Sequence, residues 1–238
     1  MTEKLLVAKN LAKSFGRFKV LNGINLTINR GDIYILFGSN GAGKTTLVKI
    51  LSTILSADSG ELTIFGKNIK RHAPNNIKSM IGFMSHEPYL YNELTAWENL
   101  NFYANIFSIK DKKERIENLL KEVGLYHRSH DRVGSFSRGM KQRLSLARAV
   151  LHRPEIIFLD EPYAGLDIKA QEILNDFIIK SNKAGKTFFL ITHDIGMGFE
   201  TANRSGILSK GQIVYEAKGE KKKVFSEKYK EIIKGETG

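Results

Sequence analysis

The sequence predicts an α/β fold that combines a mostly parallel sheet, an antiparallel β-subdomain and an inserted helical subdomain. Three observations predict it. A glycine-rich loop at residues 38–45 lies between a short apolar run, 33–37, and an amphipathic helix expected at 44–55. A second apolar run, 156–159, ends in Asp-Glu, and residues 88–152 show the apolar spacing of helices. Short apolar runs of this kind are typical of strands buried on both faces of a parallel sheet.

Residues 1–30 are expected to form antiparallel strands, because Ile24, Leu26 and Ile28 alternate with polar residues. Further strands are expected at 62–65, after an Asp-Ser-Gly turn at 58–60, and at 80–85.

The helical block at 88–152 is expected to contain three helices. The first begins with a capping box at 95–98. The second begins at Asp111 and ends at Gly124, and the third has apolar residues at helical spacing over 140–151.

The C-terminal part returns to strands and helices in alternation. After the apolar run at 156–159, a helix is expected at 168–184 and a strand at 187–192, followed by a hairpin around Lys210-Gly211. The last twenty residues are highly charged, so they are expected to be frayed apart from a short helix near Tyr229.

The loop at 38–45 matches the phosphate-binding pattern G-x-x-x-x-G-K-[ST]. Its glycines would let the backbone turn tightly and approach a phosphate, and the N–H groups at the helix start would form an anion nest. Lys44 would bring positive charge to the outer phosphates, and Thr45 would offer a hydroxyl to Mg²⁺. A glycine turn with a chance lysine is the competing interpretation, which the strand and helix on either side disfavour. The predicted triphosphate contacts are Gly38, Ser39, Asn40, Gly41, Ala42, Gly43, Lys44, Thr45 and Thr46.

The apolar run at 156–159 ends in two carboxylates at what should be the carboxyl edge of the sheet, where ligands bind in such folds. Asp160 is expected to hold Mg²⁺ there, through a water. Glu161 is expected to polarise a water for attack on the γ-phosphate. The alternative is an acidic turn before Pro162, which the nearby phosphate loop makes less attractive.

Two further features point to the same ligand. Residues 136–143 begin the third helix, and Ser137 and Gly139 would permit close approach of an anion to that helix end. One nucleotide cannot easily reach two such helix starts of one chain, which suggests binding in trans. His193 follows a strand and could contact the γ-phosphate. Taken alone, a serine N-cap and a structural histidine would be the simpler interpretations.

The chain has 238 residues and a formal net charge of +12, from 37 Lys and Arg against 25 Asp and Glu. A basic surface can bind nucleic acid or anionic lipid. The lysines are scattered, however, and their dense cluster at 218–234 is interleaved with glutamate, so a solvated surface is preferred and nucleic acid is not expected as a partner. The longest apolar runs fall far short of the about 20 residues of a membrane span. The N-terminus lacks the apolar core of a signal peptide and the chain has no cysteine, so a soluble, cytosolic protein is expected.

Together these features resemble the ATP-binding subunit of an ABC transporter over nearly the whole chain. Residues 38–45 look like its Walker A loop, and residues 156–161 look like Walker B with the catalytic glutamate. His193 is similar to the switch histidine, and Asp167 lies in what resembles the D-loop. The signature sequence, usually Leu-Ser-Gly-Gly-Gln, is matched by Phe136 and then by Ser137, Arg138, Gly139 and Met140. Phe15 is similar to the aromatic that stacks on adenine, with Val20 alongside.

The resemblance implies a single ABC ATPase domain over 1–238 with ATP and Mg²⁺ as cofactors. A nucleotide-binding core with the β-subdomain would take 1–87 and 153–217, the helical subdomain 88–152, and a charged tail 218–238. Two copies, identical or not, would face head to tail, with each ATP between Lys44 of one and Ser137 of the other. Hydrolysis would drive a separate membrane permease and place the subunit on the inner face of the membrane. The sequence looks most like exporter-type subunits, such as haem-exporter and ABC-2 ATPases, although it does not name the cargo.

Two positions depart from the family pattern. Arg138 and Met140 stand where glycine and glutamine are usual, while Ser137 and Gly139 are kept. His86 stands at the Q-loop position, where a glutamine touches Mg²⁺ or the attacking water. Protonation of an imidazole would repel Mg²⁺, so the hypothesis is that turnover falls below about pH 6.5.

Two alternatives stay open at this point. An ABC ATPase that acts on nucleic acid or the ribosome would share these motifs, but such members usually have long coiled coils or paired cassettes. A generic P-loop kinase or GTPase would leave residues 137–140 and His193 unexplained.

Overall fold

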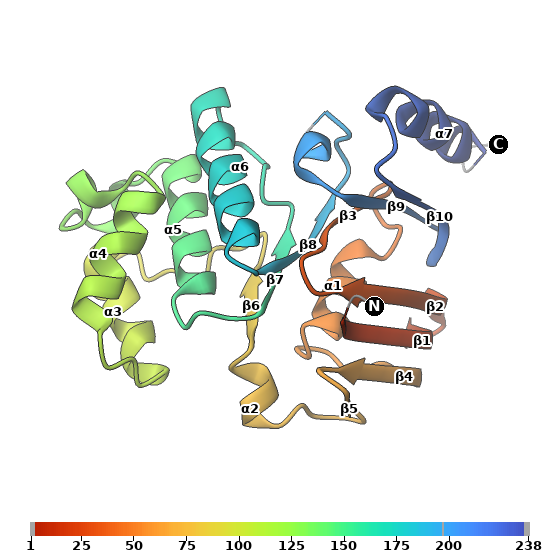
Figure 1. The fold of residues 1–238 in the computed structure, drawn as a ribbon, viewed down its shortest axis with the longest axis horizontal. Helices are drawn as coiled ribbons and strands as arrows, with labels where there is room; N and C mark the ends of the chain where they lie inside the picture. The colour runs from red at the N-terminus through yellow and green to blue at the C-terminus, as the bar shows by residue number, and fades with distance from the viewer. Residues whose placement is uncertain (1–2, 197, 236–238) are drawn as a thin grey trace.

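The computed structural model describes residues 3–196 and 198–235, which contain two sheets (Figure 1). The central six-stranded sheet has the order β10-β9-β3-β8-β7-β6, and its strands are parallel except for β10. The second sheet has the order β2-β1-β4-β5 and is antiparallel. This arrangement confirms the predicted fold class. The strands are β1 (Lys4–Phe15), β2 (Phe18–Asn29), β3 (Ile33–Phe37), β4 (Ser59–Ile64), β5 (Lys67–Asn68), β6 (Ile81–Met84), β7 (Ile156–Asp160), β8 (Thr187–Thr192), β9 (Arg204–Ser209) and β10 (Gln212–Lys218).

Helices cover both faces and one edge of the central sheet. Helix α1 packs between the two sheets, where it contacts β2, β7 and β8. Helices α3, α4 and α5 group together beyond β6, and α6 lies between α5 and the strands (Figure 1). The helices are α1 (Lys44–Leu51), α2 (Asn75–Lys78), α3 (Ala96–Ile106), α4 (Lys112–Glu122), α5 (Arg138–Val150), α6 (Ile168–Lys183) and α7 (Lys222–Lys234).

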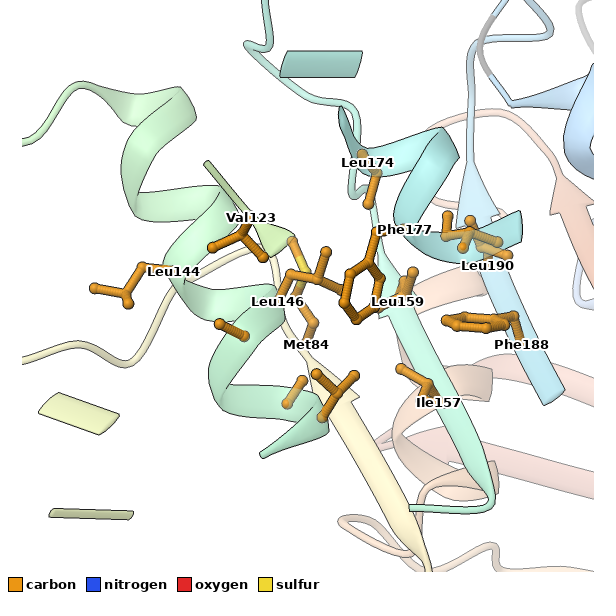
Figure 2. Close-up of a cluster of buried hydrophobic side chains, with 14 of the residues drawn as sticks. Met84, Val123, Leu144, Leu146, Ile157, Leu159, Leu174, Phe177, Phe188 and Leu190 are labelled. Carbon is orange, nitrogen blue, oxygen red and sulfur yellow. The ribbon is translucent and has the colours of Figure 1, made fainter. Parts of the chain in front are cut away.

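The central strands are buried on both faces, as their unbroken apolar sequences predict. Because side chains alternate along a strand, Ile35 and Phe37 of β3 enter one hydrophobic cluster while Tyr34 and Leu36 enter the other. The first cluster joins the sheet to α4, α5 and α6, and Figure 2 shows its centre, where Leu146 of α5 points toward the side chains of β7 and α6. The second cluster joins the other face to α1 and the antiparallel sheet. The strand ends that carry the polar motifs are therefore held in a rigid frame.

The expected capping box at the start of α3 is confirmed. The Oγ1 of Thr95 accepts a hydrogen bond from the backbone N–H of Glu98 at 3.1 Å, and the Glu98 carboxylate accepts one from the N–H of Thr95 at 2.8 Å. These bonds lower the pKa of Glu98. Reciprocal satisfaction of two free N–H groups fixes where α3 begins.

Two local predictions are wrong, and a third is correct only in part. Helix α1 ends at Leu51 instead of residue 55, because Thr53 takes a left-handed conformation (φ +65°), and Ile54 is 56% exposed rather than on a buried face. Two residues of the expected turn at 58–60 already belong to β4, which begins at Ser59, and Gly60 serves close strand packing, since a Cβ there would lie 2.4 Å from the carbonyl oxygen of Asn10. The short helix expected near Tyr229 is confirmed, but it extends over Lys222–Lys234 as α7, and the fully buried ring of Phe225 anchors it instead of leaving a frayed tail.

Candidate functional site

The carboxyl ends of β3, β6, β7 and β8 meet at one edge of the central sheet, which brings motifs far apart in sequence together. Phe37 pairs with Thr192 and Asp160 pairs with Ile191, so the glycine-rich loop lies beside the ends of β7 and β8. A cavity of about 560 Å³ opens there. It is lined by Val20, Asn40, Gly41, Gly43, Lys44, Thr45, Thr46, Lys49, Ser85, His86, Glu87, Tyr89, Asp160 and Glu161.

Glycine is required at the three loop positions 38, 41 and 43 for different physical reasons. Gly43 has φ +103°, and a Cβ there would lie 2.9 Å from the carbonyl oxygen of Val20. Gly41 has φ +83° and faces open space, so it serves the turn alone. Gly38 has no positive φ, but a Cβ would lie 2.5 Å from the carbonyl oxygen of Leu208 in β9. Gly38 is thus needed for packing within the sheet, which the sequence pattern did not indicate.

The Lys44 side chain is folded back over the loop. Its Nζ donates hydrogen bonds to the carbonyl oxygens of Gly38 at 2.9 Å and Ser39 at 3.0 Å, and it lies 4.0 Å from Oε1 of Glu161. Burial lowers the pKa of Lys44, while the carboxylates of Glu161 and Asp160 oppose that shift. A phosphate entering the loop would therefore meet a cation that is already positioned.

Asp160 has a buried carboxylate with one oxygen left free. Its Oδ1 accepts a hydrogen bond from the Thr45 hydroxyl at 3.3 Å, while Oδ2 has no hydrogen-bond partner among the described residues. The pKa of Asp160 is raised overall, mainly because the carboxylate is buried and also because of the neighbouring Glu161 carboxylate. The Thr45 hydrogen bond and His86 oppose this rise. A buried carboxylate oxygen without a partner, beside a hydroxyl, is the oxygen donor set that Mg²⁺ accepts. These residues therefore fit the ion.

Glu161 is held by the residues that end β8. Thr192 donates from Oγ1 to Oε2 at 3.0 Å, and Nδ1 of His193 lies 2.9 Å from Oε1. The backbone of Glu161 is left-handed (φ +50°), an uncommon conformation for a residue other than glycine. Thr192 was not singled out from the sequence. Its position next to His193 was the one available signal.

Several predicted site residues do not line the cavity. Ser137 caps α5 through a hydrogen bond from the N–H of Met140 at 3.2 Å, and Asp167 caps α6 through one from the N–H of Ala170 at 2.8 Å. Phe15 is half exposed, with Nζ of Lys13 lying 5.5 Å from its ring. None of the three is among the described residues that form the cavity wall.

The two residues that depart from the predicted signature sequence, Arg138 and Met140, lie differently. Arg138 is exposed and its stem packs on Gly165, where a Cβ would lie only 2.7 Å from Cδ of Arg138. Met140 is partly buried and packs against the core between the sheet and the helices. Met140 therefore serves packing, whereas Arg138 remains at the surface beside Ser137.

A family model described as ABC transporter matches residues 21–164. The chain belongs to the ABC transporter family. This membership confirms the predicted ATP-binding, ATP-hydrolysing subunit of an ABC transporter.

Curated relatives and solved structures of ABC transporter cassettes agree with this assignment. The chain is 37% identical to the bacitracin transport ATP-binding protein BcrA of Bacillus licheniformis over 96% of its own length and 74% of that protein. It is 33% identical to the SkfA peptide export ATP-binding protein SkfE of Bacillus subtilis, over 89% and 88% of the two chains. A dimeric structure of the ATP-binding cassette MJ0796 with ADP and phosphate has a TM-score of 0.82, at 27% identity over 91% of this chain and 99% of that one. These relatives give no support to action on nucleic acid or the ribosome.

In this ABC subunit the membrane-spanning part was expected on another chain. Within residues 3–196 and 198–235, each helix is too short or too polar to cross a bilayer.

The predicted Q-loop residue, His86, gives a pH prediction for the subunit. His86 is exposed on the cavity wall, where a positive charge on its imidazole would lower the pKa of the Asp160 carboxylate. A protonated imidazole there would oppose Mg²⁺. We therefore expect the acid-side fall in turnover to shift to lower pH in His86→Gln, as measured by steady-state ATPase rates between about pH 5.5 and 8. An acid limb that is the same in both proteins would contradict the role of His86, and His72→Gln in the β-subdomain is the matched control.

Proposed function

We propose that this ABC subunit hydrolyses Mg-ATP as one half of a pair and that the pair powers export through a separate membrane permease. Export is supported by the relatives named for bacitracin transport and SkfA peptide export. Pairing is supported by the dimeric MJ0796 cassette with ADP and phosphate.

The observation that carries the pairing is the division of the site. The cavity wall holds the phosphate loop and Glu161, but the start of α5 lies outside it with Ser137 and Arg138 exposed. The first N–H groups of a helix have no acceptor within that helix and favour anions. Each copy therefore has one open phosphate cradle and one unused anion-binding helix end. In a head-to-tail pair, the phosphate cradle of each copy would face the α5 helix end of the other copy, so that two complete sites would form.

Within that pair, the chemistry is mainly positioning and charge stabilisation, as phosphoryl transfer requires. Thr45 and Asp160 would hold Mg²⁺, which when bound neutralises charge on the phosphate oxygens. Lys44 would exchange its contacts with two loop carbonyl groups for contacts with phosphate. Glu161 would accept a proton from the attacking water, with its carboxylate aimed by Thr192 and His193.

We further propose that the permease contacts an exposed apolar patch next to the Q-loop. The patch is formed by Tyr89, Tyr91, Phe102 and Ile106, all of which are exposed. The rings of Tyr91 and Phe102 pack edge to face at 5.2 Å, and Tyr103 donates to the carbonyl oxygen of Tyr89 at 2.9 Å. Tyr89 also lines the cavity, so one residue belongs to both surfaces. Exposed aromatic clusters of this kind are typical of protein interfaces.

Two inactive variants test the divided site. Lys44→Ala removes the cation from the phosphate loop, whereas Gly139→Asp puts a negative charge in the first turn of α5. An acidic residue there stabilises the helix, and a Cβ at 139 meets only Leu166 at 3.5 Å, so the second variant should fold. We expect each variant alone to lose ATPase activity by about 100-fold or more.

Co-expression of the two variants should restore about a quarter of the parental rate, because half of the pairs then contain one intact site. Gly139→Ala is the control for the added side chain and should keep most of the activity. A mixture that stays as inactive as its components would overturn the divided site.

A further inference from the structure

Gln142 links α5 to the end of β7. Its side chain is only 6% exposed, and its Nε2 donates hydrogen bonds to the carbonyl oxygens of Glu161 at 3.2 Å and Pro162 at 3.3 Å. A buried amide donor aimed at two backbone carbonyl groups is a specific contact rather than a solvated side chain. The cavity wall does not include Gln142, so it would act through the residues that it holds.

The residue that Gln142 contacts has a backbone that needs support. Glu161 has φ +50°, and a left-handed conformation outside glycine persists only where surrounding contacts impose it. Its N–H donates to the carbonyl oxygen of Ile191 at 3.0 Å, and its own carbonyl oxygen also accepts from the N–H of Ala164 at 3.2 Å. Gln142 donates to this carbonyl from a different element, α5, so it fixes the turn from outside the turn itself.

Helix α5, which carries Gln142, is held rigidly in place by its own packing and hydrogen bonds. Leu144 and Leu146 are buried in the cluster shown in Figure 2. Arg143 donates to the carbonyl oxygen of Val123 at 2.7 Å, and Arg148 donates to that of Phe83 at 3.3 Å. The helix is thereby tied to α4 on one side and to β6 on the other.

The same helix begins at Ser137, five residues before Gln142, which is about 7.5 Å along the helix axis. Under the proposed function, Ser137 faces the nucleotide of the second copy. Helix α5 would therefore contact the nucleotide of the second copy at Ser137. About one and a half turns later, through Gln142, it would contact Glu161, the general base of its own copy.

We propose that Gln142 is a positioning residue for ATP hydrolysis. It holds the strained backbone of Glu161 so that the carboxylate meets Thr192, His193 and the attacking water. This role rests on the proposed function of Glu161 as the base.

Gln142→Met tests the role because methionine keeps the length and bulk but has no N–H donor. We expect kcat to fall roughly tenfold, the worth of one lost buried hydrogen bond, with unchanged affinity for ATP. Asn182→Leu is the matched control, since the Asn182 amide also donates to two carbonyl oxygens, of Gly31 at 3.0 Å and Lys186 at 2.8 Å, at the opposite edge of the sheet. This control should lose stability in thermal unfolding while kcat stays at the parental value.

Gln142→Asn, whose shorter amide cannot reach the carbonyl groups, is the second variant and should show the same loss of kcat. The loss should also vanish in a Glu161→Gln background, because Gln142 acts only through the carboxylate. Parental kcat in both Gln142 variants would overturn the inference while leaving the proposed function intact. Parental turnover of Glu161→Gln would instead overturn the base itself. A fall in kcat that is equally large in the Glu161→Gln background, or equally large in Asn182→Leu, would show a general structural role and also overturn it.

Discussion

Glu161→Gln is expected to bind ATP and to lose turnover by about 1,000-fold, the contribution typical of a general base. Glutamine has the shape of glutamate, so its carbonyl oxygen can still accept from the Thr192 hydroxyl, which lies 3.0 Å from Oε2 in the parental protein. The amide cannot take a proton from water. Binding and chemistry should therefore separate in this variant.

Because hydrolysis would release the pair, Glu161→Gln should also accumulate as an ATP-dependent dimer, which size-exclusion chromatography with and without Mg-ATP would measure. Glu155→Gln is the matched control. Glu155 lies at the other end of β7, in ion pairs with Arg30 and Lys186 at 2.7 and 3.1 Å, and its loss should lower stability but not turnover. Turnover of Glu161→Gln at the parental rate would be incompatible with the assigned base.

The parts of the fold that follow from local sequence were predictable. The strand at 187–192 has the bounds expected from its apolar run, and the capping box at Thr95 has both of its reciprocal bonds. Such elements are specified by neighbouring residues alone. The phosphate loop belongs to the same class, since its pattern already contains the turn, the charge and the helix start.

Features that depend on contacts distant in sequence were not predictable. Phe225 anchors α7 by packing on Phe37 at 5.2 Å and Phe199 at 5.1 Å, and the local sequence, which indicated a short helix near Tyr229, did not indicate these contacts with residues far away in sequence. Likewise, the carbonyl oxygen of Leu208, 170 residues further along the chain, explains why position 38 is glycine. Propensity and periodicity describe local preference, whereas these cases are decided by tertiary packing.

The site shows the same division. The carboxyl ends of parallel strands always share an edge, so Lys44, Asp160 and Glu161 could be expected to meet. The hydrogen bonds of Thr192 and Gln142 to Glu161 could not be predicted, because a buried polar residue and a solvated one look alike in a sequence.

Asp160→Asn is expected to change activity and stability in opposite directions. The parental carboxylate is 1% exposed, with Oδ2 unbonded among the described residues and Glu161 next in sequence. Removing its charge should weaken the Mg²⁺ site and lower ATPase activity by about 100-fold or more. Without nucleotide or metal, the same change should raise the free energy of unfolding by roughly 1 kcal/mol, because an unpaired buried charge is lost.

The pH dependence gives this prediction a sign that can be checked. Burial raises the pKa of Asp160 in the folded state above 3.8, its ordinary value, so the folded state binds the proton more tightly than the unfolded chain. The parental protein should therefore recover stability relative to the variant as pH falls through the folded pKa toward 3.8, and the gap between the two unfolding curves should close. Chemical denaturation in EDTA, from neutral pH downward, measures the difference in free energy of unfolding between the two proteins. Saturating Mg-ATP at neutral pH should reverse the sign of this difference, because it should stabilise only the parental protein. A variant that is less stable than the parent without ligand would mean that the Asp160 carboxylate already has its partners within the fold, and that its free oxygen is not kept for the metal.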